Sequence, residues 1–198
     1  MIDRRQPSNV AKFQTRNPVV QRLIDRFFGN IAAIVKPLNA TSVLDAGCGE
    51  GETIARLASL LPQPTSAVDI EQRCVEHVRA RFPAVQVSRQ SVTDLSFDDD
   101  QFDLVLCLEV LEHLEDPGAA VGELGRVAAE HLIISVPLEP WFQLGSLIRG
   151  KHLGALGNHP EHVNHFNRRS LDSLLRPHVE IDRIEVSFPW LIATGHPR

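Results

Sequence analysis

The fold of this chain is decided by one stretch, Val43-Leu44-Asp45-Ala46-Gly47-Cys48-Gly49-Glu50-Gly51. Two apolar residues lead into an acidic residue, three glycines follow at alternate positions, and apolar residues then recur at helical spacing over 53–61. This order predicts a strand, a glycine turn and a helix, which is how a parallel sheet presents its carboxyl edge and a helix N-terminus to a ligand. Glycine is needed where the backbone takes positive φ or approaches a ligand closely. We therefore expect a nucleotide-like cofactor on Gly47, Gly49 and Gly51.

The composition is that of an ordinary globular protein. The 198 residues are 43% hydrophobic and 23% charged, which suits a single domain over 1–198. No stretch reaches the length of about eighteen apolar residues that a membrane span needs, and the N-terminus carries no apolar leader, so we expect no stable membrane insertion and a cytoplasmic location. Cys48, Cys74 and Cys107 form no C-x-x-C pair and are expected to be reduced core residues. The net charge of -5 argues against a nucleic-acid partner.

Strands and helices alternate along the chain. Pro18 and the apolar stripe after it predict an amphipathic helix that ends near Lys36-Pro37. Apolar runs predict the next elements, which are strands over 43–46, 66–70, 85–87, 102–108 and 132–136 and helices over 52–61, 73–82 and 117–129. A short helix near 171–175 and a hairpin of 181–186 with 190–193 complete the chain. This alternation is typical of an α/β sheet with right-handed crossovers, whose fifth strand is followed by an irregular segment, 138–166.

The glycine spacing by itself leaves the ligand open. Gly47-x-Gly49-x-Gly51 is not the G-x-G-x-x-G of dinucleotide sites, because position 52 is Glu52. Asp69 ends the second expected strand, at about the twenty-residue distance where a carboxylate accepts hydrogen bonds from ribose hydroxyls. That arrangement suits NAD or another adenosine cofactor equally well, and a strand–helix turn without a ligand is a further alternative.

Five stretches in order resemble the class I S-adenosylmethionine-dependent methyltransferases, in particular the small-molecule branch that is similar to the ubiquinone-biosynthesis enzymes. Val43–Gly51 is similar to the first motif of this family. Residues 68–70 resemble the ribose clamp, and residues 91–97 resemble the adenine-facing loop. Residues 102–114 resemble the fourth strand with its following helix, and residues 133–137 resemble the fifth strand. The resemblance implies a Rossmann-like, doubly wound α/β sheet of seven strands, mostly parallel, with an antiparallel C-terminal hairpin and helices on both faces.

The resemblance also implies which residues bind the cofactor S-adenosylmethionine. Their order follows the motifs: Asp45, Gly47, Cys48 and Gly49 at the methionine end, Asp69 and Ile70 at the ribose, Thr93 and Asp94 at the adenine, and Leu108, through its backbone, followed by Glu109. An acidic edge suits a cofactor that bears a sulfonium and an ammonium, whereas the carboxylates would repel the pyrophosphate of a dinucleotide. Cys48 is expected to be a small packed side chain and not a nucleophile.

The N-terminal segment belongs to the same site in this family. Lys12–Pro18 resembles the variable cap that crosses the methionine end of the cofactor. The cap helix is expected to lie within 1–37, and Arg16 would pair there with the cofactor carboxylate in bidentate fashion. A plain surface arginine is the alternative.

Histidines are the candidate catalytic residues. His113 follows the fourth strand, near the acceptor side in this family, and His162 and His165 lie in the segment 138–166. Each could act as a base or contact the acceptor, and packing is the alternative role. The three-residue spacing of histidines within 159–165 permits metal binding, but the glycines and prolines around it offer no regular scaffold, and we expect no metal.

The expected acceptor is a small molecule. Methyltransferases that act on amino groups of nucleic acids or protein glutamine often carry Asn/Asp-Pro-Pro-aromatic after the fourth strand, where this chain has Leu108–Leu111. Apolar residues of 138–166 are expected to form a lid over a hydrophobic acceptor; a dimer contact or a membrane-surface contact is the alternative. The leading hypothesis is therefore methyl transfer from S-adenosylmethionine to an oxygen, nitrogen or carbon atom of a small molecule. A cofactor-binding module without catalysis and, less favoured, an NAD-dependent oxidoreductase are the alternatives.

Overall fold

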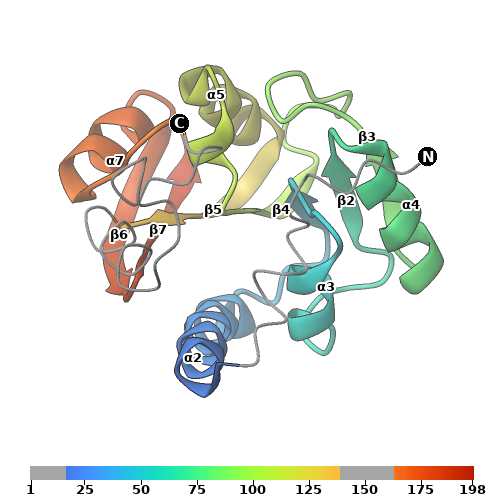
Figure 1. The fold of residues 1–198 in the computed structure, drawn as a ribbon. Helices are drawn as coiled ribbons and strands as arrows, with labels where there is room; N and C mark the ends of the chain where they lie inside the picture. Colours follow the sequence, from blue (N-terminus) through green and yellow to red (C-terminus); the bar gives the residue numbers. More distant parts are fainter. Residues whose placement is uncertain (1–16, 139–162) are drawn as a thin grey trace.

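Seven strands form one sheet in the order β3-β2-β1-β4-β5-β7-β6 in the computed structural model, which describes residues 17–138 and 163–198 (Figure 1). In chain order the strands are β1 Val43–Ala46, β2 Ser66–Asp69, β3 Gln86–Arg89, β4 Phe102–Leu108, β5 Ala128–Pro137, β6 Val179–Ser187 and β7 Trp190–Pro197. The pairs among β1 to β5 are parallel, and β7 is antiparallel to both β5 and β6. This confirms the expected sheet with an antiparallel C-terminal hairpin.

Helices cover both faces of this sheet (Figure 1). One face carries α2 Pro18–Val35, α3 Glu52–Leu57 and α4 Gln72–Arg81, and the opposite face carries α5 Pro117–Val127 and α7 Arg168–Leu175. The 3-10 helices η1 Lys36–Leu38 and η2 Leu111–His113 follow α2 and β4. In the described part of the chain, no helix is both long and apolar enough to cross a membrane.

The helix α2 starts at a well-formed cap. The side chain of Asn17 accepts the N–H groups of Val19 at 3.0 Å and Val20 at 3.4 Å, and Pro18 stands where a helix needs no N–H. Its buried side chains recur at helical spacing: Ile24, Phe27, Phe28, Ile31 and Val35. They form one apolar cluster with residues of β1, β4, β5 and β7. The expected amphipathic helix is therefore confirmed, and it ends at Val35, directly before the expected Lys36-Pro37.

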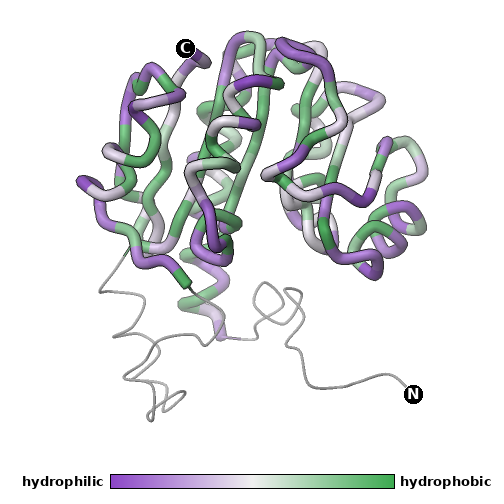
Figure 2. Tube along the Cα trace, turned by 90° about the horizontal axis from the view of Figure 1, so that it is seen from above, coloured by the Kyte–Doolittle hydropathy of each residue, from purple (hydrophilic) through white to green (hydrophobic). Residues whose placement is uncertain are grey.

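The strands carry the core, and their residues alternate between the two layers of helices. Figure 2 shows hydrophobic residues running along the strands, next to helices that alternate between hydrophobic and hydrophilic faces. Leu44 and Ala46 of β1 pack in the cluster under α5 and α7, whereas Val43 packs in the cluster under α2. Because side chains alternate along a strand, Asp45 projects from the same face as Val43.

Several boundaries differ from the expected ones because tertiary contacts override local preference. The helix α3 ends at Leu57, and the chain continues to position 61 in hydrogen-bonded turns. The strand β5 begins at Ala128, inside the expected helix over 117–129, because Ala128 is fully buried and pairs with Phe102. Both C-terminal strands are longer than expected because they pair with each other along almost their whole length. Directly after β4, where a helix was expected, the chain forms the short η2.

Candidate functional site

The glycine loop after β1 has a backbone that favours glycine. Gly47, Gly49 and Gly51 have φ of 79, 52 and 81°. A Cβ on Gly47 would collide with the side chain of Val110, so the turn after β4 approaches this loop closely. The N–H of Gly47 also donates to the carbonyl of Val68 at 2.9 Å, which fixes the loop to the end of β2. The positive φ that the sequence predicts is therefore present, and the close approach at Gly47 is to a side chain of the protein.

Asp69 fastens the glycine loop to β2. Its Oδ2 accepts the N–H of Gly49 at 2.8 Å, and its Oδ1 accepts the N–H of Glu71 at 2.8 Å. Each carboxylate oxygen has a second lone pair, so both can still accept a hydrogen bond from a ligand hydroxyl. The next residue, Ile70, has a side chain that is 61% exposed at the same edge. Sequence reasoning placed Asp69 at this edge but missed its hold on the loop, for which the sequence carries no local signal.

Asp45 places a buried carboxylate next to the glycine loop. It is 1% exposed, and its Oδ2 has no hydrogen-bond partner among the described residues. Burial and, second, the charge of Asp69 raise the pKa of Asp45 to about 7. Burial followed by the charges of Asp45 and Asp69 also raises the pKa of the Cys48 thiol, so this thiol stays neutral and is not a nucleophile.

The loop after β3 brings Thr93 and Asp94 to the edge where Asp69 lies. The N–H of Gln90 donates to the carbonyl of Asp69 at 3.2 Å. The hydroxyls of Ser91 and Thr93 share a hydrogen bond of 2.7 Å, and the N–H of Asp94 donates to the carbonyl of Ser91 at 3.1 Å. These contacts form a tight turn that is tied to the end of β2 through Asp69.

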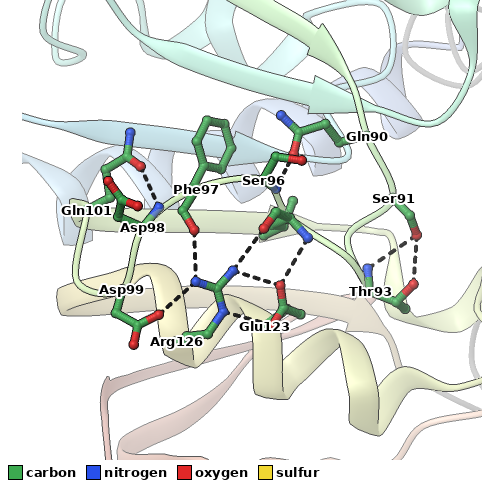
Figure 3. A network of polar contacts seen from close by, with 11 residues as sticks. Gln90, Ser91, Thr93, Ser96, Phe97, Asp98, Asp99, Gln101, Glu123 and Arg126 are labelled. Atoms are coloured by element: carbon green, nitrogen blue, oxygen red, sulfur yellow. Dashed lines mark hydrogen bonds and ion pairs between the residues drawn. The ribbon is translucent and has the colours of Figure 1, made fainter.

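Arg126 of α5 holds the rest of this loop in place (Figure 3). All five N–H donors of its guanidinium are used, at distances of 2.8 to 2.9 Å, by both carboxylate oxygens of Glu123, the carbonyls of Leu95 and Phe97, and the carboxylate of Asp99. Glu123 in turn accepts the N–H of Leu95 at 3.0 Å. Sequence reasoning missed this network, because only the i,i+3 spacing of Glu123 and Arg126 is visible locally.

Glu109, directly after Leu108 at the end of β4, has a φ of 61°, which is unusual for a residue other than glycine. Its Oε2 accepts the indole N–H of Trp190 at 2.7 Å, and its Oε1 accepts the hydroxyl of Ser135 at 3.1 Å. The next residue, Val110, fills the space beside the first glycine of the loop. The two residues expected to contact the cofactor at the end of β4 therefore directly precede Val110, which packs against the glycine loop, and the side chain of Glu109 is held by β5 and β7.

The turn after β4 is tied to the segment that carries His165. The N–H groups of Val163 and Asn164 donate to the carbonyl of Glu112 at 2.9 and 3.0 Å. The Nε2 of His113 lies 3.8 Å from the Oε1 of Glu112, which is fully buried. The side chain of His165 is exposed. Two of the three histidines singled out by the sequence are thus in the same part of the fold.

Two predicted site residues, Arg16 and His162, lie outside the described residues, as does the segment 139–162 of the expected lid. Within residues 17–138 and 163–198, no three His, Cys, Asp or Glu side chains are arranged to hold a metal ion. A groove of about 790 Å³ lies elsewhere, between α2, η1 and the strands β5, β6 and β7, and no predicted site residue lines it. Concavity alone therefore does not mark the candidate site.

The chain matches a known protein family over most of its length. Residues 13–178 match the model of a family described as a methyltransferase domain. The chain is 33% identical over 165 residues to a probable S-adenosylmethionine-dependent methyltransferase of Mycobacterium tuberculosis, covering 82% of this chain and 53% of the relative. It is 30% identical over 138 residues to the ubiquinone biosynthesis O-methyltransferase of Azorhizobium caulinodans, covering 64% and 53%. The chain thus spans about half the length of these curated relatives.

Solved structures share the fold at low sequence identity. Magnesium protoporphyrin IX methyltransferase from Synechocystis PCC 6803, solved with bound SAH, matches with a TM-score of 0.73 at 20% identity, covering 96% of this chain and 92% of that chain. The cyclase SpnF matches with a TM-score of 0.69 at 17% identity, covering 89% and 82%. Proteins named for different reactions therefore share this sheet, and the fold alone does not decide the reaction.

Proposed function

Because this chain belongs to the methyltransferase domain family and has the fold of the class I S-adenosylmethionine-dependent enzymes, we propose that it methylates an oxygen, nitrogen or carbon atom of a small molecule. One observation carries the proposal beyond family membership. The buried Oδ2 of Asp45, which has no hydrogen-bond partner in the described part of the chain, lies at the glycine loop within the field of Asp69. A buried carboxylate in this position is stabilised by a cation.

The charges at this edge fit S-adenosylmethionine better than a dinucleotide. Among the described residues, the titratable groups that raise the pKa of Asp45 and of Cys48 are carboxylates and a thiol, and none of them is a basic side chain. The methionine end of S-adenosylmethionine carries a sulfonium and an ammonium, which these carboxylates attract. A dinucleotide would bring a pyrophosphate against the same carboxylates, and the like charges would repel. This difference supports a methyl donor over NAD.

The residues proposed for the cofactor are those of the sequence motifs. They are Asp45, Gly47, Cys48 and Gly49 for the methionine end, Asp69 and Ile70 for the ribose, Thr93 and Asp94 for the adenine, Leu108 and Glu109 after β4, and Arg16 for the carboxylate. The hydrogen bonds of Asp69 and the network of Arg126 support this assignment, because they fix two of these loops through contacts within the protein itself. A prearranged loop loses less conformational freedom on binding.

S-adenosylmethionine supplies an activated methyl group, and the protein has to hold the acceptor lone pair in line with it. A base is useful only for a hydroxyl or a protonated amine, and His113, His162 and His165 are the proposed candidates. The sequence after β4 departs from the motif of amino-methylating enzymes, and one relative is named an O-methyltransferase. Both facts support a small-molecule acceptor, with a hydrophobic one favoured by the apolar residues in 138–166.

Binding without catalysis is a second candidate function. It is kept because methyl transfer needs no obligatory catalytic side chain, so the same cofactor site can serve either function. Two measurements separate the candidates. Calorimetry with S-adenosylhomocysteine tests the cofactor, and no heat of binding at high micromolar ligand would refute both. Incubation with methyl-labelled S-adenosylmethionine and a panel of phenols, carboxylic acids and amines tests catalysis. Labelled product removes the binding-only candidate, and its absence across the panel favours it.

A further inference from the structure

Asp45 differs from Asp69 and Glu109, two other carboxylates expected at the cofactor. Asp69 has both oxygens engaged by backbone N–H groups, and Glu109 has both engaged by Trp190 and Ser135. The Oδ2 of Asp45 has no such partner in the part of the chain that the structure describes, and the residue is 1% exposed. Burying an ionised oxygen without a partner is costly, and among residues 17–138 and 163–198 no hydrogen-bond donor stabilises the charge on this oxygen.

The groups that face Asp45 make its ionisation harder. Asp69 lies on β2, Cys48 lies in the glycine loop, and Cys107 lies on β4; the charge of Asp45 acts on both thiols. Further out, Cys74 of α4 acts on Cys48, and Glu112 of η2 acts on Cys107. These groups are acids or neutral thiols, so no neighbouring element of the described fold contributes a positive charge to Asp45. Burial and the charge of Asp69 accordingly raise its pKa to about 7.

We propose that in mildly acidic solution Asp45 is protonated in the cofactor-free protein and releases this proton to solvent when the cationic methionine end of S-adenosylmethionine binds. The O–H bond of the carboxylic acid breaks, water or buffer takes the proton, and the carboxylate remains paired with the bound cation. S-adenosylmethionine carries one positive charge more than S-adenosylhomocysteine, so the carboxylate favours the methyl donor over the spent product. Asp45 is therefore a specificity-determining residue that distinguishes the two by charge. The inference rests on the cofactor of the proposed function and is independent of the acceptor.

The sign of the pH dependence follows from this proton. Below about pH 7, binding requires deprotonation, so the affinity for S-adenosylmethionine rises by up to about tenfold per pH unit as pH increases toward 7. Above pH 7, Asp45 is already ionised in the free protein, and the affinity becomes independent of this group. The affinity for S-adenosylhomocysteine rises less steeply, so the preference for the methyl donor grows with pH up to the same point.

Calorimetry in buffers of different ionisation enthalpy measures the proton directly. We expect S-adenosylmethionine to release about one proton near pH 6, where its own α-amino group is protonated, and none near pH 8.5. Asp45→Asn keeps the shape of the side chain and removes the titrating group, so its binding should release no proton and its affinity should not change with pH. Asp25→Asn, the same change on the exposed surface of α2, is the matched control and should behave like the unchanged protein.

Each outcome decides the matter. Binding without proton release near pH 6 overturns the inference and leaves the proposed function standing, whereas absence of any cofactor binding overturns both. If the Asp45→Asn protein still releases a proton on binding, the proton comes from another group, and the inference is overturned as well. If Asp45→Asn does not fold, carbon-13 NMR of aspartate-labelled unchanged protein follows the carboxyl carbon of Asp45. A shift from the neutral to the ionised position on adding S-adenosylmethionine near pH 6 supports the inference, and an unchanged position refutes it.

Discussion

The indole Nε1 of Trp190 donates a hydrogen bond of 2.7 Å to the Oε2 of Glu109, joining the hairpin strand β7 to the turn after β4. The ring of Trp190 also lies 4.8 Å from that of Phe27 in α2. One tryptophan therefore connects the N-terminal helix, the sheet and the strained residue next to the glycine loop. The position of the Glu109 carboxylate therefore depends on β5 and β7, elements far away in the sequence.

Trp190→Phe tests this connection. Phenylalanine keeps the ring packing against Phe27 and removes the N–H, so we expect a loss of about 2 kcal/mol in the free energy of unfolding, the usual range for a hydrogen bond to a charged group. Urea unfolding measures it. Ser135→Ala removes the longer of the two hydrogen bonds to Glu109 and should cost less. Equal losses for the two variants would contradict the dominant role of the indole.

Arg126→Lys tests how the adenine-side loop is held. Lysine keeps the positive charge and loses the fork of five donors, so the carbonyls of Leu95 and Phe97 lose their partner. We expect the affinity for S-adenosylhomocysteine to fall roughly tenfold, with a smaller effect on folding. Arg176→Lys, in the exposed pair with Asp172 on α7, is the matched control and should not change binding. A fall of the same size in both variants would refute the role of Arg126.

Gly47→Ala tests the close approach of the two loops. An alanine there has an unfavourable φ of 79° and a Cβ that collides with Val110, so we expect a loss of about 2 kcal/mol or more in stability. Val110→Ala in the same chain should restore the part due to the collision and leave the part due to φ. Gly29→Ala, in the exposed middle of α2 with no atom near the added carbon, should instead stabilise the protein by about 0.5–1 kcal/mol. Thermal unfolding compares the three.

Asp69→Ala tests the proposed ribose contact together with the hold on the glycine loop. Removing the carboxylate releases the N–H groups of Gly49 and Glu71 and deletes the acceptor for the ribose hydroxyls. We expect the affinity for S-adenosylhomocysteine to fall by about a hundredfold, or about 2.7 kcal/mol. Adenosine, which carries the ribose without the methionine end, should lose affinity by a similar factor. Unchanged calorimetric affinity for either ligand would disprove the ribose role of Asp69.

The sequence predicted the sheet and the glycine loop well because both follow from local patterns. The apolar runs of β1 and β4 give strands, and the three glycines have the positive φ that their spacing indicated. The start of β5 at Ala128 was missed because two alanines and an acidic residue favour a helix, and only pairing with β4 turns them into a strand. Local preference gives way where a neighbouring strand offers hydrogen bonds and burial.

Side chains that act across the chain could not be predicted in the same way. Arg126 reaches a loop about thirty residues away, and Trp190 reaches Glu109 from a separation of 81 residues. Neither contact follows from a fixed spacing of residues along the sequence, because such contacts depend on the order of strands in the sheet. The sequence named the residues of the candidate site, whereas the hydrogen bonds that fix Asp69 and Glu109, and the lack of a described partner for the Oδ2 of Asp45, required the fold.

Leu138 and Phe166 form a parallel bridge, and the N–H of Leu138 donates to the carbonyl of Pro189 at 2.9 Å. The chain therefore leaves the sheet and returns to it at one point. The entropy of closing a loop between two joined ends rises only slowly with its length. A change in the length or composition of the chain between these two residues therefore costs the pairing of the sheet little. The junction of Leu138 and Phe166 thus gives evolution a place to vary this protein while the sheet is inherited unchanged.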